Sequence, residues 1–348
     1  MKQHRRITTK QKGIIGGLLA AYAILAGVAL WGYNLAWRPN FFPQETYYIY
    51  VDQQRDFEQV CKQLEAASCR DLSGFRRVAQ WRKCPSQLKT GRYAVKAGMS
   101  NWELVNNLRR GNQVATRVVF NNIRLKEELA ARLGEQLMLQ ADELLQLWND
   151  SAYCDSLGFT TLTLPTLFIP DTYELYWNIS AEQFMRRMMR EYKAFWTPER
   201  LAQAERVGLK PAEVAILASI VEEETAAADE YPIVAGLYLN RLKKGIPLQA
   251  DPTVKFAVGD FTLRRILTVH LEVESPYNTY KHTGLPPGPL RIPSRRGLEA
   301  VLHPMQHTYL YMCAKEDFSG RHNFARTLAE HNRNADRYRA ELNRRKIR

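Results

Sequence analysis

The longest apolar run lies near the N-terminus, where the 21 residues 13–33 include no charged side chain. A helix of about 20 residues covers the hydrocarbon core of a bilayer, so this run predicts a membrane span. Five basic residues and no acidic residue precede it. The positive-inside rule therefore predicts a cytoplasmic N-terminus and export of the chain that follows, with Trp31, Tyr33 and Trp37 at the outer interface.

A cleaved secretory signal is the alternative interpretation of this run. Ala21-Tyr22-Ala23 has the small-residue pattern of a cleavage site. The apolar run continues for about ten residues beyond that site, which is longer than a signal requires and favours a retained anchor. Both interpretations export the body of the chain.

After the run, the pattern alternates between strand and helix spacing. Residues 47–51 alternate as a strand, and residues 57–64 have the spacing of an amphipathic helix. A second strand is predicted at 91–95. A helix with a Ser and Glu capping box, ended by glycine, is predicted at 100–111, and a third strand at 114–120. Together these elements predict a small αβ module.

From Leu125 onward the apolar residues recur mainly at helical intervals. Helices are predicted within 125–148 and, from their N-terminal capping residues, within 180–208. Residues 248–304 are rich in loop signals, and a last helix is predicted at 324–342. The chain therefore belongs to the α+β class, with a mixed α/β domain after the module.

Three successive carboxylates end an otherwise apolar helical pattern at residues 214–224. On a helical wheel Glu222 lies at the edge of the apolar face, beside alanines that leave room for a ligand. Glu223 points away from that face and is expected to be solvated. Glu224 projects near the centre of the face, where an ionised carboxylate needs a hydrogen-bonding or cationic partner. The helical wheel indicates Glu222 and Glu224 as the candidate catalytic carboxylates and does not rank them.

The net charge of +13 raises the question of nucleic-acid binding. Residues 1–12 carry +5 and residues 321–348 carry +6, so the 308 residues between them carry only +2. A body with so little excess charge has no basic field to follow a phosphate backbone. The composition argues against a nucleic-acid partner.

The cysteines and histidines show no metal-binding pattern. No C-x-x-C pair occurs, and no glutamate completes a metalloprotease motif around the histidines. We therefore expect no metal and no cofactor. A disulfide among the first three cysteines stays open, since the five are Cys61, Cys69, Cys84, Cys154 and Cys313.

Two segments within the loop-rich region combine amides, hydroxyls and aromatic rings with stiffening prolines. Rings stack on sugar faces, while amides and hydroxyls pair with sugar alcohols. For any one of these residues a role in a turn is the simpler interpretation; their accumulation near a carboxylate helix favours a carbohydrate site. The candidate substrate-binding or supporting residues are Gln249, Asp251, Thr253, Ser275, Tyr277, Asn278, Thr279 and Tyr280.

With these motifs the chain resembles the MltG-like (YceG-like) endolytic murein transglycosylases. The resemblance covers nearly everything after the apolar run, and its motifs occur in the family's order. Two positions depart from the pattern: Phe256 stands where tyrosine is common, and Leu290–Ser294 replaces a stretch with asparagine and glycine. The motifs are Pro170–Tyr173, the glutamate helix, both loop segments and Thr327–Asn332.

The resemblance implies a single-pass protein of the inner (plasma) membrane whose exported part cuts within nascent peptidoglycan strands. It implies a cytoplasmic basic tail at 1–12, a transmembrane helix at 13–33, a LysM-like module at 46–120 and a catalytic domain at 121–348. Peptidoglycan glycan strands are the implied substrate, and peptidoglycan synthases are candidate partners.

The resemblance also implies that Glu222, the first glutamate of the family motif, is catalytic and that Glu224 supports it. One carboxylate suffices for a transglycosylase. Glu222 protonates the glycosidic oxygen that leaves C1 of N-acetylmuramic acid, then accepts the proton of that sugar's C6 hydroxyl as the hydroxyl attacks C1. The product is a 1,6-anhydro end, and we expect burial to raise the pKa of Glu222.

Two alternatives remain open. A hydrolytic muramidase needs a second carboxylate, for which Asp251 or Glu224 is available. A non-catalytic, membrane-anchored glycan-binding scaffold needs none. Analysis of reducing ends separates the enzymes, because only the transglycosylase leaves anhydro ends.

Overall fold

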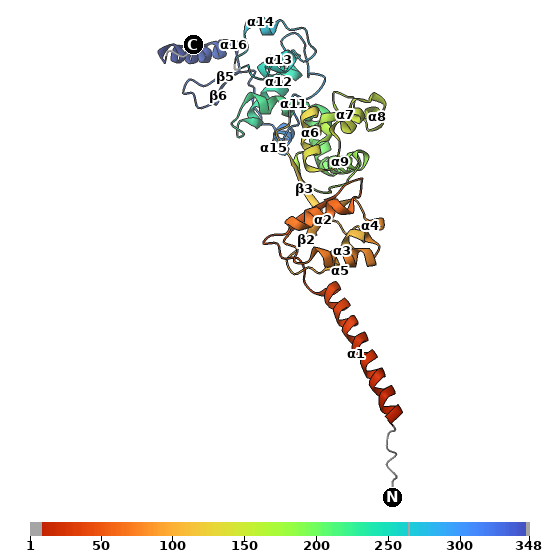
Figure 1. Ribbon diagram of the computed structural model, residues 1–348. Helices are drawn as coiled ribbons and strands as arrows, with labels where there is room; N and C mark the ends of the chain where they lie inside the picture. Colours follow the sequence, from red (N-terminus) through yellow and green to blue (C-terminus); the bar gives the residue numbers. More distant parts are fainter. Residues whose placement is uncertain (1–8, 264, 346–348) are drawn as a thin grey trace. The chain divides into compact units, whose positions relative to one another are not determined.

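The computed structural model describes residues 9–263 and 265–345 (Figure 1). Most of the described chain is helical, and its three sheets have two strands each, which confirms the α+β class. The chain divides into two compact units. One contains the residues up to Thr116 together with Glu174–Asn178, and the other contains Arg117–Tyr173 and the chain from Ile179 onward. Most of the basic tail predicted at residues 1–12 lies outside the described residues.

The first unit begins with the long helix α1 (Thr9–Trp37). Its segment Lys12–Trp37 contains an 18-residue window with a mean hydropathy of 2.2 and is long and apolar enough to cross a membrane. The side chains of residues 14–31 are exposed, as the lipid-facing side chains of a single span would be.

Residues 39–114 of the first unit form the N-terminal module. β1 pairs with β2 in antiparallel register, and four helices cover their buried side. The strands β1 and β2 and the helices α2 and α5 confirm predicted elements. Gly111, in the left-handed conformation, ends α5 as predicted. Two helices between the strands were not predicted. The elements are β1 (Tyr47–Val51), α2 (Phe57–Ala66), α3 (Leu72–Trp81), α4 (Cys84–Gln87), β2 (Gly91–Val95) and α5 (Asn101–Arg110).

The end of α1 is tied to this module by a buried amide cluster. Asn101 Nδ2 donates to the Leu35 carbonyl at 2.9 Å. Asn40 Nδ2 donates to Asn101 Oδ1 at 2.7 Å, and Asn40 Oδ1 accepts from the Asp71 backbone at 2.8 Å. Since Asn40 is 4% exposed and Asn101 is 3% exposed, these bonds satisfy groups that water does not reach.

The second sheet pairs β3 (Ala115–Phe120) with β4 (Asp171–Tyr176). Both strands contain residues of each unit. Apart from its residues in these strands, the second unit is helical up to a C-terminal hairpin of β5 and β6. Its elements are α6 (Lys126–Gln136), α7 (Ala141–Asn149), α8 (Ser151–Ser156), η1 (Leu164–Leu167), α9 (Ala181–Phe195), α10 (Pro198–Val207), α11 (Pro211–Glu224), α12 (Tyr231–Lys243), α13 (Asp251–Val258), α14 (Thr268–Leu271), α15 (Arg295–Leu302), β5 (Tyr311–Ala314), β6 (His322–Ala325) and α16 (Leu328–Arg344).

Two predictions for this unit were wrong in part. The region 248–304 contains three helices, and Pro252 marks the start of α13 instead of a loop. A proline is tolerated in the first helical turn because that amide has no partner within the helix. The last helix begins at Leu328, capped by Thr327, whereas Phe324 lies in β6.

Helix α11 lies at the centre of the second unit. All eight residues from Val214 to Val221 are buried, and α11 contacts α10, α12, α13 and α15. A helix that is apolar on every side is a core helix. Residues 214–221 are therefore the core of this unit.

We predict that Asn40→Ala destabilises the N-terminal module by about 1–3 kcal/mol, because it leaves buried polar partners unpaired. Thermal unfolding followed by calorimetry measures the effect. Asn112→Ala, at an exposed asparagine of the same module, is the control and should change the free energy of unfolding by less than about 0.5 kcal/mol. Equal stability of the two variants would contradict the role of the amide cluster.

Candidate active site

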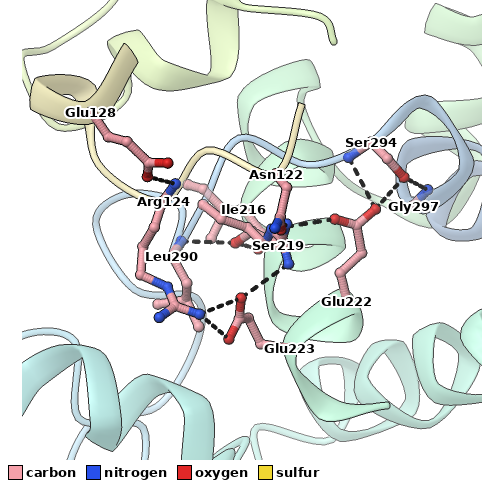
Figure 2. A network of polar contacts seen from close by, with 11 residues as sticks. Asn122, Arg124, Glu128, Ile216, Ser219, Glu222, Glu223, Leu290, Ser294 and Gly297 are labelled. Carbon is pink, nitrogen blue, oxygen red and sulfur yellow. Dashed lines mark hydrogen bonds and ion pairs between the residues drawn. The ribbon is translucent and has the colours of Figure 1, made fainter. Parts of the chain in front are cut away.

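The C-terminal turn of α11 presents three glutamates to three different environments. Glu222 faces the N-terminus of α15 (Figure 2). Its Oε1 accepts a hydrogen bond from the Ser294 amide at 2.9 Å and another from the Ser294 hydroxyl. Its side chain is only 5% exposed, and Arg291 Nε lies 3.7 Å from Oε2.

The carboxylate of Glu222 fills the space beside Gly297. A Cβ at Gly297 would collide with Glu222 Oε1. Ser294, the N-cap of α15, accepts from the Gly297 amide at 3.1 Å through the same hydroxyl that donates to Glu222. Burial raises the pKa of Glu222, and the bonds from Ser294 and the charge of Arg291 oppose that rise. Protein atoms therefore occupy the space beside Oε1 of this carboxylate.

Glu223 lies between two arginines. Arg124 Nη2 is 2.7 Å from its carboxylate and Arg291 Nη1 is 3.1 Å from it. Arg291 also donates to Asn122. The two ion pairs of Glu223 join α11 to two segments that are distant in the sequence. The expectation that Glu223 is solvated was wrong: its side chain is 14% exposed, because neighbouring segments cover α11 on every side.

Glu224 has a single hydrogen-bond partner among the described residues, the hydroxyl of Tyr238, which donates to its Oε1. The expectation that its carboxylate needs a partner is confirmed. Burial raises the pKa of Glu224 to about 7; the bond from Tyr238 lowers it and the charge of Asp251 raises it further. A carboxyl group with this pKa is partly protonated near neutral pH.

Glu224 lines a cavity of about 340 Å³ whose walls are largely polar. Gln249, Asp251 and Tyr280, three residues from the two predicted sugar-binding segments, line the same cavity. Tyr280 donates to Asp251 Oδ1 at 2.6 Å. The other polar residues of the lining are Tyr238, Arg241, Tyr311, His322 and His331.

Gln249 has a left-handed backbone, with φ of 49°. The backbone amide of Gln249 donates to the Thr279 carbonyl at 3.1 Å, and its side-chain Oε1 accepts from Arg241 Nη2 at 2.5 Å. Arg241 also donates to the Pro247 and Leu310 carbonyls at 2.9 and 2.7 Å. A strained, non-glycine backbone held by such bonds is typical of functional sites.

A buried carboxylate orients His322 at the wall of the cavity. Glu230 accepts from the Thr225 hydroxyl and the His322 amide, both at 3.0 Å. The Nδ1 atom of His322 lies 2.9 Å from Glu230 Oε2. Sequence reasoning missed this pair, as well as Tyr238 and Arg241, because no local motif connects residues 92 positions apart.

The other predicted residues use their polar groups within the protein. The hydroxyls of Thr253 and Thr279 lie 2.7 Å apart, and both residues are buried. Asn278 is fully buried and donates to two backbone carbonyls. The turn interpretation therefore accounts for these three.

Ser275 and Tyr277 also contribute to the loop. Ser275 Oγ accepts from the Tyr277 amide at 3.2 Å. The Tyr277 ring packs against Phe256, with 4.7 Å between centroids. Neither residue lines the cavity around Glu224.

Three further observations concern a second cavity, metal binding and the cysteines. A cavity of about 480 Å³ between α10, α12 and residues 302–307 contains no carboxylate and none of the predicted residues. Within residues 9–263 and 265–345, no group of three or more His, Cys, Asp or Glu side chains could hold a metal ion. The five cysteines are free in this structure.

Comparisons with known proteins give one family. The model of the YceG-like family matches residues 49–337. An endolytic murein transglycosylase of Bacillus subtilis (strain 168) is 48% identical over 123 residues, which are 35% of this chain and 33% of that protein. An endolytic murein transglycosylase of Streptococcus pneumoniae serotype 2 is 25% identical over 290 residues, which are 74% of this chain and 52% of that protein.

The chain thus spans a third to a half of the length of these two relatives. A crystal structure of a yceG-like protein from Listeria monocytogenes is similar, with a TM-score of 0.54 and 26% identity. The similarity covers 83% of this chain and 99% of that one.

We predict that Gly297→Ala destabilises the protein by about 1–3 kcal/mol, because the added methyl group forces the Glu222 carboxylate from its bonds with Ser294. The control is Arg296→Ala, an exposed position in the same turn of α15. Chemical unfolding of the two variants measures the difference. A Gly297→Ala protein as stable as the control would mean that Glu222 has room to move.

Proposed function

Because the chain belongs to the YceG-like family, we propose that it is an endolytic lytic transglycosylase of peptidoglycan, a lyase that cleaves the MurNAc–GlcNAc bond within nascent strands. The curated relatives bear this activity in their names. The observation that carries the proposal is the polar cavity in which Glu224, with a pKa of about 7, meets Gln249, Asp251 and Tyr280.

The geometry favours Glu224 over Glu222 as the acid, which differs from the role that the family motif suggested. Glu222 accepts two hydrogen bonds from Ser294 through Oε1, and the same oxygen lies against Gly297, so that oxygen is already engaged within the protein. Glu224 accepts one bond, from Tyr238, and borders open space. A general acid must reach the leaving oxygen, and that criterion of access selects Glu224.

In the proposed reaction, protonated Glu224 donates its proton to the glycosidic oxygen as the bond to C1 of N-acetylmuramic acid breaks. The C6 hydroxyl of the same sugar attacks C1, and ionised Glu224 accepts the hydroxyl proton. The 1,6-anhydro ring forms, and the carboxyl group returns to its starting state. Because the nucleophile belongs to the substrate, its high effective concentration replaces an activated water.

The walls of the cavity suit a sugar. Tyr280 and Tyr311 supply rings, and Gln249 supplies an amide fixed by Arg241. His322, oriented by Glu230, adds a polar group from β6. We assign these residues to substrate binding, and Thr253, Asn278 and Thr279 to support of the loops.

Hydrolysis is the second candidate, because the cavity contains another carboxylate. Asp251 raises the pKa of Glu224 through its charge, so the two groups interact. A hydrolase would use Asp251 to activate water or to stabilise the cation. Digestion of intact glycan strands and mass spectrometry of the new ends separates the two: anhydro ends support the transglycosylase, and reducing ends support the muramidase.

The remaining organisation follows from the family and from α1. We assign α1 as a single membrane anchor with its N-terminus in the cytoplasm, residues 46–120 as a LysM-like module and residues 121–348 as the catalytic domain. The positive charge before the span sets this orientation. The catalytic domain then lies outside the cytoplasm, where peptidoglycan and its synthases are.

We predict that Glu224→Gln lowers the rate of anhydro-end formation by at least about 10²-fold while the fold persists, because glutamine cannot donate and retake the proton. Glu222→Gln should keep measurable anhydro-end formation and lower the melting temperature, because its network of bonds is buried. Strand digestion and thermal unfolding of both variants measure the two effects.

The opposite result would reassign the acid. If Glu224→Gln digests strands normally while a stable Glu222→Gln protein is inactive, Glu222 is the general acid. The Gly297 contact would then have to open before substrate binds.

We predict that kcat/KM falls as pH rises through about 7, because the acid form of Glu224, the reactive one, is lost above its pKa. Tyr238→Phe removes a bond that lowers this pKa and should move the falling limb to higher pH. Asp251→Asn removes a charge that raises it and should move the limb to lower pH. A profile that neither variant shifts would show that another group supplies the proton.

A further inference from the structure

A row of aromatic rings in contact runs from the end of α1 onto the N-terminal module. The centroids of Tyr33 and Trp37 are 5.4 Å apart, and those of Trp37 and Trp102 are 4.8 Å apart. Trp81 extends the row, with its centroid 5.9 Å from that of Trp102. All four residues belong to the same unit of the structure.

The row ends in an exposed tryptophan. Trp81 is 66% exposed and Trp37 is 42% exposed, although both have the large apolar surface that folding normally buries. Trp81 is the last residue of α3, and Trp102 lies in the first turn of α5. Both helices contact α1 directly, so the rings extend from the helix that could span the membrane.

The position along α1 sets the depth of these rings. The apolar run ends at Tyr33, before Asn34, and Trp37 lies one helical turn later, about 6 Å further along the axis. A bilayer has a polar interfacial layer of roughly 5–7 Å on each side of its core. Trp37 and the rings stacked on it therefore fall at the depth where tryptophan is most favourable.

One arginine packs on the aromatic row, and two others lie near the end of α1. The Arg82 guanidinium lies over the Trp102 ring, 4.3 Å from the centroid. Arg38 and Arg70 line a cavity of about 240 Å³ at the end of α1, together with Trp31. Asp71 lines the same cavity, but its carboxylate caps α3 through the Gly74 amide. Guanidinium groups at this depth meet the phosphates of lipid headgroups.

We propose that the side of the module around the end of α1, with the row Trp37, Trp102 and Trp81 and with Arg38, Arg70 and Arg82, lies in the headgroup layer of the outer face of the membrane. The occupant is the lipid bilayer that α1 crosses, so the inference rests on the assignment of α1 as an anchor. Because the buried amide cluster around Asn40 ties α1 to the module, the module is fixed on the membrane surface and does not swing on a tether.

The test uses the full chain in nanodiscs of phosphatidylcholine brominated on the acyl chain close to the headgroup, which quenches tryptophan at interfacial depth. Trp81→Phe should lose a lipid-quenched component of the emission that the unsubstituted chain shows. Trp177→Phe is the matched control, because Trp177 belongs to the same unit but packs against Tyr50, with 5.1 Å between centroids. That control should lose only emission that the lipid does not quench.

Water-soluble acrylamide gives the complementary measurement. In nanodiscs Trp81 should be protected from acrylamide, and the protection should increase when anionic phosphatidylglycerol is added, because the arginines bind its phosphates. Arg38→Ala with Arg70→Ala should abolish that increase. Circular dichroism checks that each variant keeps its fold.

Three outcomes separate the proposals. If Trp81→Phe loses acrylamide-quenched emission and no lipid-quenched emission, the surface faces water and the inference is overturned. If Trp81→Phe loses emission that neither acrylamide nor lipid quenches, a protein partner covers Trp81 and the inference is overturned as well. If brominated lipid quenches no tryptophan of the unsubstituted chain, Trp31 included, α1 does not span the bilayer and the anchor assignment itself fails.

Discussion

The burial of α11 on every side is the constraint on which the second unit depends. Eight consecutive residues of this helix are buried, so the unit is built around it from α10, α12, α13 and α15. A central helix leaves no solvated face for polar side chains. Each glutamate at its end therefore needs a partner in the protein or a cavity of its own.

The three glutamates meet this requirement in different ways. Glu222 and Glu223 bond to Ser294, Arg124 and Arg291, which join α11 to segments before and after it in the chain. Burial also raises the pKa of Glu222, and the bonds from Ser294 and the charge of Arg291 oppose that rise. Glu224 has a neutral partner, Tyr238, so burial dominates and its pKa rises to about 7. In our proposal the first two hold the helix end in place, and the third is free for proton transfer.

In the N-terminal unit, too, buried polar groups have partners in the protein, whereas its exposed apolar rings are suited to the membrane surface. Its amides are satisfied where they are buried, around Asn40 and Asn101. Its large apolar rings are left exposed in a row that begins at the end of α1. Exposed tryptophan is unfavourable in water and favourable in the headgroup layer, which is why we assign that surface to lipid.

The elements that the sequence determined by itself are those whose causes are local. The apolar run that forms α1, the alternation of β1, the Ser180 capping box of α9 and the glycine that ends α5 each depend on neighbours within a few positions. The glutamate motif likewise located the candidate site, and the two loop segments supplied Gln249, Asp251 and Tyr280 to its cavity.

Only the tertiary structure decided which glutamate borders that cavity. The helical wheel assumes that one face of a helix meets solvent, and α11 has no such face. The bond between Ser294 and Glu222 joins residues 72 positions apart, and the contact between His322 and Glu230 joins residues 92 apart. No local pattern records contacts over such distances, because packing of the whole unit brings these residues together.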